Sequence, residues 1–215
     1  MTSMPHKPGL LFLLIALVFW CLPGQANVFV NPESYNLNFY IGSLDPDEEA
    51  GVLENPSSNI AIGFASNNQS RTYPYLGVDL ELWLLQSEYA NTLPPPLFVS
   101  LNDEMELETL VLSIGGRVMV PYGTPYSFYL SAGYGYYYSD MRVYANLLGI
   151  PGYYEDSTQT IAPYFGAGFR YEMGYRQTLE IFYRKWTPEG DFKGFSIPET
   201  ELGGEVMGIG FGLLW

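Results

Sequence analysis

The last nine residues, Met207-Gly208-Ile209-Gly210-Phe211-Gly212-Leu213-Leu214-Trp215, alternate between bulky apolar side chains and glycine. Successive side chains of an extended strand point to opposite faces. One face of this segment therefore carries apolar and aromatic groups, and the other face is mostly glycine. Such a period-two pattern is typical of a β-strand whose two faces meet different environments.

Seven more segments of the chain show the same alternation. They are separated by stretches rich in Pro, Gly, Asn and Asp, which are typical of turns and loops. In chain order these segments are 35–44, 60–65, 76–83, 110–120, 126–139, 162–173 and 179–184. The sequence therefore predicts eight strands. In the fourth, Glu104, Glu106 and Glu108 share the parity of Leu110, which predicts either a β-bulge or glutamates that stand clear of a membrane.

The composition excludes two broad classes of protein. The 215 residues are 47% hydrophobic, 17% aromatic and only 15% charged, with a formal net charge of −14. A disordered acidic chain would be poor in apolar and aromatic residues. A nucleic-acid binder would carry dense basic patches, whereas Lys and Arg together number 9 here. No nucleic-acid partner is expected.

The first 26 residues predict a cleaved secretory signal peptide. His6 and Lys7 precede the apolar run of residues 10–22, and Gly24 and Ala26 supply the small residues of a cleavage site. The domains are therefore residues 1–26, removed, and residues 27–215, the mature barrel. Cleavage removes the chain's one His and its one Cys, Cys21. Disulfides, Cys nucleophiles and His-based catalysis are excluded for the mature chain.

The chemistry of the two strand faces decides between a soluble and a membrane barrel. A soluble barrel would show a polar outer face rich in Lys, Glu, Ser and Thr. Here the second face holds Gly, Ala, Tyr, Asn and a few charges of both signs, and the mature chain has only two lysines, Lys185 and Lys193. The apolar face, with its tyrosines, suits lipid and its interfaces. Since an open sheet edge in lipid leaves backbone groups unpaired, the prediction is an all-β, closed, eight-stranded, antiparallel up-and-down transmembrane β-barrel.

The connections predict the orientation of the barrel. The shorter links are 67–72, 121–125 and 174–177, and the longer ones are 45–58, 86–103, 139–159 and 187–204. Bacterial barrels place short turns in the periplasm and long loops outside the cell. Both termini are therefore expected to be periplasmic.

The chain resembles the OmpA/OmpX-like small outer-membrane β-barrel proteins of Gram-negative bacteria. The resemblance covers the whole mature chain, and its local carriers are residues 128–136 (FYLSAGYGY), residues 163–171 (PYFGAGFRY) and the terminal strand. It implies a place in the outer membrane, contact with lipid and lipopolysaccharide, and insertion by the barrel assembly machinery. It also implies a C-terminal assembly signal, in which Leu213 replaces the usual aromatic residue; the residues assigned to this signal are Gly210, Phe211, Leu213 and Trp215.

Strand parity places seven charged residues on the predicted lumen face, and they form a lumen charge network: Asp79, Glu81, Arg117, Arg170, Glu172, Glu180 and Arg184. Buried charges are costly unless they pair, which accounts for the mixed signs. Eight strands leave an interior just wide enough for side chains. We therefore favour a polar plug that fills the lumen, with a polar gate or narrow pore as the alternative.

The long loops are acidic and predict contacts with cations or partners. Carboxylates occur in all four of them, including Asp45, Glu88, Asp140 and Glu189. Divalent cations could bridge this rim to lipopolysaccharide phosphates. The alternative is a calcium site in the first loop, where residues 45–49 (DPDEE) could supply some oxygen ligands but lack the spacing of an EF-hand. Long loops on a rigid scaffold can also hold an extracellular partner. No catalytic, cofactor-binding or metal site is predicted.

The functional prediction is a monomeric barrel with a structural or surface-interaction role, resembling an adhesion protein. The first alternative is a narrow porin-like pore or a transport channel for a small ligand. The second is a lipid-modifying outer-membrane enzyme. Known small barrels of that kind use a His with a Ser, and the mature chain has no His; the chain is therefore expected not to be an enzyme.

Overall fold

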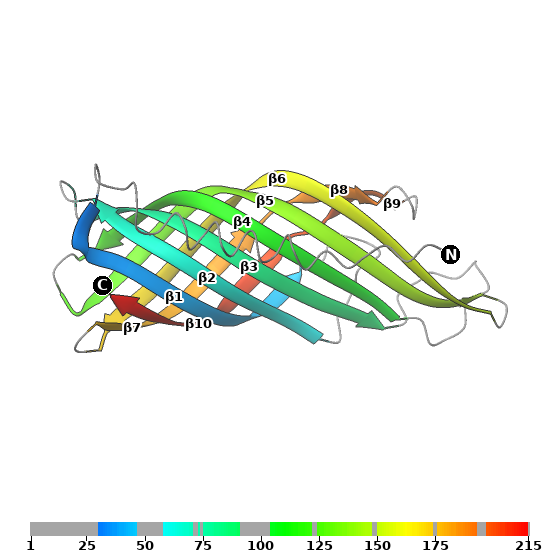
Figure 1. Ribbon diagram of the computed structural model, residues 1–215, viewed down its shortest axis with the longest axis horizontal. Helices are drawn as coiled ribbons and strands as arrows, with labels where there is room; N and C mark the ends of the chain where they lie inside the picture. The colour runs from blue at the N-terminus through cyan, green and yellow to red at the C-terminus, as the bar shows by residue number, and fades with distance from the viewer. Residues whose placement is uncertain are drawn as a thin grey trace.

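Eight antiparallel strands close into one barrel in the computed structural model (Figure 1). The structure describes residues 30–46, 58–70, 73, 75–90, 104–121, 124–147, 150–173, 176–192 and 197–214. Around the barrel the strands follow the order β1-β10-β7-β6-β5-β4-β3-β2. Each strand thus pairs with its neighbours in the chain, and β10 closes the ring on β1. The predicted closed eight-stranded up-and-down barrel is confirmed.

The strands are longer than the sequence predicts. The barrel strands are β1 (Val30–Pro46), β2 (Ser58–Ser70), β3 (Leu76–Ala90), β4 (Glu104–Val120), β5 (Tyr126–Leu147), β6 (Ile150–Glu172), β7 (Gln177–Trp186) and β10 (Gly204–Leu214). Between β7 and β10, the short strands β8 (Glu189–Phe192) and β9 (Ile197–Glu201) form a separate hairpin. No helix in the described part of the chain is long and apolar enough to cross a membrane.

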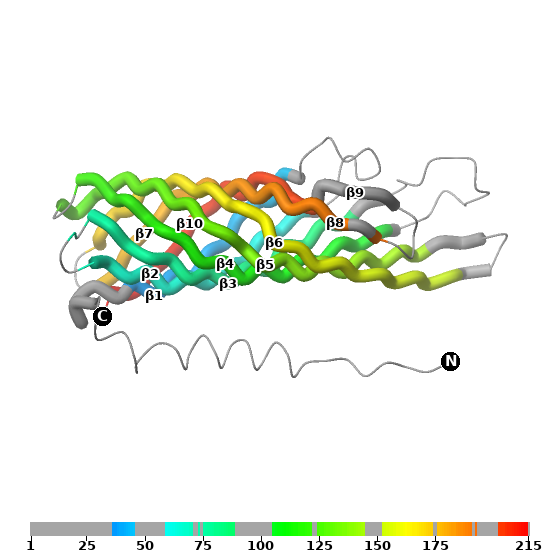
Figure 2. The backbone as a smooth tube through the Cα atoms, turned by 90° about the horizontal axis from the view of Figure 1, so that it is seen from above, coloured from blue at the N-terminus to red at the C-terminus, as the bar shows by residue number. Residues whose placement is uncertain are grey.

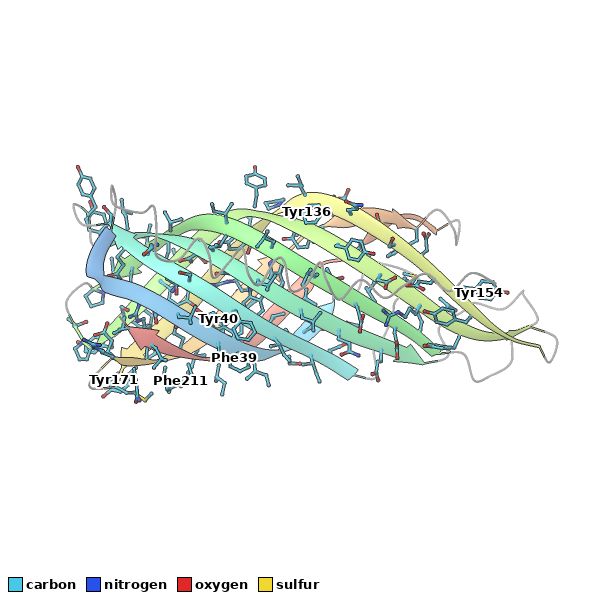
Figure 3. The ribbon with its side chains drawn as sticks, in the orientation of Figure 1. Phe39, Tyr40, Tyr136, Tyr154, Tyr171 and Phe211 are labelled. Atoms are coloured by element: carbon cyan, nitrogen blue, oxygen red, sulfur yellow. The ribbon has the colours of Figure 1, made fainter. Side chains whose placement is uncertain are left out.

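The two faces of each strand lie in different environments, as the alternation predicts. On the outside, Ile114, Leu130 and Ile161 are 61%, 68% and 71% exposed. On the inside, Tyr40 and Trp83 are fully buried. Figure 3 shows adjacent residues of β1, Phe39 and Tyr40, whose exposed fractions are 42% and 0%. The apolar side faces outward, which is the arrangement of a barrel in lipid.

The two ends of the barrel differ in their connections. The chain passes from β2 to β3, from β4 to β5 and from β6 to β7 at one end of the barrel, where β10 also ends (Figures 1 and 2). We call this the turn end, and the opposite end the loop end. At the loop end the chain passes from β1 to β2, from β3 to β4, from β5 to β6, and from β7 to β10 by way of β8 and β9. The grouping of the links by end agrees with the predicted one.

Several predicted connections are wrong in their bounds. The predicted loop 86–103 overlaps β3 as far as Ala90, and the predicted loop 187–204 contains β8 and β9. Two further segments lie largely on strands. The segment 139–159 is not a loop, because β5 and β6 pair continuously from Tyr126↔Tyr171 to Leu147↔Ile150. The segment 67–72 is not all turn either, because β2 continues to Ser70 and Asn67 pairs with Asp79. In both places the polar residues lie on strands. Polar composition indicated loops here, but a sheet that extends beyond the membrane has polar residues on its strands as well.

The glutamates at the start of β4 are explained without a β-bulge. The register of β4 against β5 runs unbroken from Glu104↔Tyr144 to Val120↔Phe128. On the outer face of β5, the unbroken run of apolar and aromatic residues stops at Tyr138, and Asp140 and Arg142 follow before Tyr144. The glutamates therefore stand on the outer face beyond the apolar band, which is the second of the two predicted alternatives.

Candidate functional site

The interior of the barrel holds two tightly bonded pairs of opposite charge. In the first, Arg117 Nε donates to Asp79 Oδ2 at 2.8 Å, and both side chains are buried. The other carboxylate oxygen of Asp79 accepts from Asn67 Nδ2 at 2.7 Å, and the Asn67 oxygen in turn accepts from Asn38. These contacts join β4, β3, β2 and β1, which are consecutive strands of the barrel wall, near the turn end.

In the second pair, Arg184 binds Glu81 with two nitrogens. Nη2 lies 2.8 Å from Oε1, and Nε lies 3.3 Å from Oε2. Both side chains are fully buried. The indole of Trp83 also donates to Glu81, at 2.9 Å. A bidentate guanidinium–carboxylate contact is the strongest ion-pair geometry available to arginine, and here it joins β7 to β3.

Glu180 carries the third buried carboxylate and contacts the first pair through Arg117. Its Oε2 accepts a hydrogen bond from Tyr40 at 2.8 Å, and its Oε1 lies 3.7 Å from Arg117 Nη1. The guanidinium of Arg117 also lies over the ring of Tyr129, 3.9 Å from the centroid. Cations are attracted to aromatic faces at this distance. The network therefore spans the lumen without an exposed charge.

The structure thus brings together five of the seven residues predicted for the lumen network: Asp79, Glu81, Arg117, Glu180 and Arg184. Arg170 is also buried, with Nη2 3.5 Å from Glu172. Glu172 is the last residue of β6, at the turn end, and its side chain is 44% exposed. Arg170 and Glu172 form a separate pair at the mouth.

An aromatic layer that the sequence reasoning missed lies next to the charged pairs. Trp83 stacks on Tyr40 at 5.4 Å between centroids, and it also contacts Phe182 and Trp186, each at 5.4 Å. All four side chains are at most 2% exposed. Their parity is the signal that could have found them, because Trp83, Phe182 and Trp186 share the lumen face of their strands with buried charges. Tyr40 shares the lumen face of β1 with the buried Asn36 and Asn38. Charge network and aromatic layer together fill the interior.

Three of the four residues assigned to the C-terminal assembly signal lie in β10. Phe211 and Leu213 project outward and are 44% and 39% exposed, while Gly210 faces inward. A Cβ at Gly210 would overlap the ring of Tyr40, which is fully buried, so only glycine fits here. Trp215 lies outside the described residues. The role of the segment in assembly stays a prediction.

A charged cluster lies on the outer face of β4 and β5 at the loop end. Arg142 Nη2 lies 3.1 Å from Asp140 and 3.2 Å from Glu108, and Nη1 lies 3.9 Å from Glu106. Partial burial and the neighbouring Glu155 raise the pKa of the Asp140 carboxyl above its ordinary value, against the opposing effect of Arg142. Among the described residues, no group of three or more His, Cys, Asp or Glu side chains is arranged to hold a metal ion.

No protein-family model and no curated protein sequence matches this chain. Solved structures match it in fold. Neisserial surface protein A shares 12% identity, with 84% of this chain and 96% of that chain covered and a TM-score of 0.49. Ail, the attachment invasion locus protein of Yersinia pestis, in complex with the heparin analogue sucrose octasulfate, shares 10%, with 84% and 97% covered and a TM-score of 0.47. The N-terminal β-barrel domain of Pseudomonas aeruginosa OprF shares 14%, with 85% and 98% covered and a TM-score of 0.39. The likeness is one of fold, to small eight-stranded outer-membrane barrels.

Proposed function

We propose that this chain, an eight-stranded β-barrel of outer-membrane type, is a non-conducting surface protein that presents a rigid β-sheet outside the cell. The observation that carries the proposal is the filled interior. Trp83, Trp186 and Arg184 are among the largest side chains of the protein, and all three are fully buried inside the barrel. An eight-stranded barrel has room for side chains or for a channel, but not for both.

The outer surface supports the proposed placement in the membrane. On β5 the exposed apolar and aromatic residues run from Tyr126 to Tyr138, a span of 13 residues. A tilted strand needs about 9–11 residues to cross the hydrocarbon core. Beyond Tyr138 the outward positions are Asp140, Arg142 and Tyr144. The loop-end parts of β4, β5 and β6 thus extend past the apolar band into water.

With this placement in the membrane, we also propose which end of the barrel faces which side. The turn end faces the periplasm, the loop end faces outward, and residues 1–26 are removed during export. Carboxylates lie at the edge of the apolar band at the loop end on three strands: Asp45 on β1, Glu108 on β4 and Glu205 on β10. Divalent cations would bridge these carboxylates to the phosphates of lipopolysaccharide.

A planar-bilayer measurement tests the closed lumen. Purified wild-type barrel should give no reproducible single-channel openings. The double variant Trp83→Ala/Trp186→Ala removes two large side chains from the aromatic layer and should give openings, which shows that the assay detects a passage of this size. Ile114→Ala, on the lipid face, is the matched control and should stay silent. Regular openings of the wild-type protein would support the pore alternative instead.

Cysteine labelling tests the orientation, because the mature chain is expected to hold no Cys. Tyr154→Cys places a thiol on the loop-end part of β6, and Tyr73→Cys places one beside a turn at the other end. A membrane-impermeant maleimide added to intact cells should label the first variant and not the second. Labelling of the Tyr73→Cys protein alone would show that the turn end, and not the loop end, faces outward.

A further inference from the structure

Five buried hydroxyl groups lie on one side of the lumen. The residues that carry them are at most 4% exposed and belong to three consecutive strands, β4, β5 and β6: Ser113, Tyr129, Ser131, Tyr137 and Tyr164. We call these five residues the hydroxyl wall. The aromatic layer lies on other strands, because its four residues belong to β1, β3 and β7. The interior therefore has an aromatic side and a hydroxyl side.

The hydroxyl wall carries polar atoms that the protein does not satisfy. Its five hydroxyl oxygens have no hydrogen-bond partner in the described part of the chain. The same holds for Nη1 and Nη2 of Arg117, which pairs with Ser131 in the register of β4 and β5. Buried polar groups are nearly always hydrogen-bonded, either to protein or to ordered water. These atoms therefore indicate a further partner along this wall.

Two glycines bring the hydroxyl groups into one row. The Tyr164 hydroxyl lies where a side chain of Gly115 would be, and the Tyr137 hydroxyl would lie 3.0 Å from a Cβ at Gly135. Gly135 pairs with Ser113, and Gly115 is the next residue of β4 on the same face. Alternate residues of a strand are about 6.7 Å apart, and a water molecule bonded to two oxygens bridges about 5.5 Å. Single water molecules therefore match the spacing of the row.

The gap between Arg117 and Glu180 marks the end of the row nearest the turn end. Nη1 of the arginine lies 3.7 Å from Oε1 of the glutamate, which is too long for a direct hydrogen bond. Neither atom has another hydrogen-bond partner among the described residues. A water molecule beside the two atoms would accept from Nη1 and donate to Oε1. Bridging water is expected where polar atoms face each other at more than about 3.5 Å.

Charge decides against an ion as the partner of the hydroxyl wall. The adjoining network holds three carboxylates and the two guanidiniums of Arg117 and Arg184, so it repels a small anion. Both oxygens of Asp79 and both oxygens of Glu81 already accept N–H groups. A cation would therefore find mainly neutral hydroxyl groups. A small neutral molecule that both donates and accepts hydrogen bonds fits the hydroxyls, the guanidinium and the free carboxylate oxygen together, and water is that molecule.

We infer that the hydroxyl wall binds a row of ordered water molecules, which runs from Arg117 and Glu180 to Ser113 and Tyr137. Folded proteins hold about one buried water per 27 residues, so a barrel of this length has room for several. The row does not open the lumen, because the fully buried Val111 follows Ser113 on the lumen face of β4 toward the loop end. The interior is thus filled by side chains on one side and by side chains with bound water on the other.

Removal of single hydroxyl groups tests the row, because the direction of the effect separates a hydrated hydroxyl from a dry one. Tyr164→Phe and Tyr137→Phe should each lower the urea midpoint of the mature barrel in lipid vesicles, because each variant loses a hydrogen bond to water. If the hydroxyls are dry, the same variants remove an unsatisfied buried group and should raise the midpoint. Tyr134→Phe, on the lipid face, is the matched control and should leave the midpoint unchanged.

Water-edited solid-state NMR of the wild-type barrel in lipid bilayers locates the water directly. Gly115 and Gly133 lie against Tyr164 in the hydroxyl wall, whereas Gly63 and Gly210 face the lumen against the rings of the aromatic layer. All four are buried lumen glycines or their close equivalents in strand position, so they differ mainly in what covers them. Magnetisation should pass from water to the first two at least threefold faster than to the second two.

Two results would overturn the inference. A higher urea midpoint for both tyrosine variants would show that their hydroxyls are buried without water. Equal transfer of magnetisation to the two pairs of glycines would show that the hydroxyl wall is as dry as the aromatic layer. Neither measurement depends on ion conductance or on which end of the barrel faces outward, so the proposed function stands or falls separately.

Discussion

Arg184 and Glu81 lie 103 residues apart in the chain, yet Nη2 of the arginine donates to the carboxylate at 2.8 Å inside the barrel. The contact crosses the lumen from β7 to β3, which are not neighbours around the barrel. A surface pair contributes little, but a fully buried pair becomes costly when one partner is lost. Removal of one partner of this pair therefore tests how much the buried charges contribute to the stability of the barrel.

Arg184→Met leaves Glu81 buried without its cation and should destabilise the barrel by about 3–5 kcal/mol. Urea unfolding in lipid vesicles, followed by tryptophan fluorescence, measures the change. Lys185→Met is the matched control one residue away, since Lys185 forms a half-exposed pair with Glu205 at 2.9 Å. The control should change stability by less than about 1 kcal/mol. Equal losses of unfolding free energy in the two variants would show that the buried lumen pair contributes no more to stability than the half-exposed pair.

Tyr40→Phe removes the hydroxyl that donates to Glu180 at 2.8 Å. The carboxylate would then keep only Arg117, whose Nη1 lies 3.7 Å away. A hydrogen bond to a charged group contributes about 1.5–3 kcal/mol, so a loss of that size is expected in the same unfolding assay. Tyr134→Phe, on the lipid face and 64% exposed, should change little. An unchanged unfolding midpoint for Tyr40→Phe would refute the assigned bond.

Gly63→Ala should destabilise the barrel by about 1–3 kcal/mol through overpacking. The added Cβ would lie 2.5 Å from the Trp83 ring, which is fully buried against Tyr40 and Trp186. Gly116→Ala is the control, because its Cβ would point outward with the nearest atom at 4.0 Å. If Gly63→Ala unfolds at the wild-type urea concentration, the aromatic layer is looser than described.

Asp140 predicts a pH dependence. Its pKa is raised in the folded state, first by partial burial and then by Glu155. A raised carboxyl pKa means that the folded state binds the proton more tightly, so this contribution to stability is complete at acid pH and is lost as pH rises through the folded-state pKa. Asp140→Asn should therefore be more stable than the wild-type protein at pH 7, and the difference should vanish at low pH.

Thermal melting of both proteins between pH 3 and pH 8 measures this effect. Asp45→Asn, on the exposed outer face of β1, controls for the removal of one negative charge. A stability difference between Asp140→Asn and wild-type protein that is the same at all pH values would contradict the role of the Asp140 proton.

The sequence alone predicted most of the fold and part of the interior. Alternation located all eight barrel strands, and parity placed Asp79, Glu81, Arg117, Glu180 and Arg184 on one face. It missed the aromatic layer, because Trp83 and Phe182 appeared as isolated exceptions on a polar face. It also took residues 139–159 for a loop, because polar residues on both faces of a strand outside the membrane carry no alternating pattern.

What the sequence determined by itself is therefore local: the extended backbone places alternate side chains on opposite faces, and the chemistry of those faces selects lipid outside and polar groups inside. Only the tertiary structure decided which groups meet. Arg184 contacts Glu81 because barrel closure and strand register bring β7 opposite β3, and neither strand encodes that distance. The end of the β6–β7 ladder at Tyr164↔Trp186 has the same origin, since it depends on where β7 stops pairing and not on β6 alone.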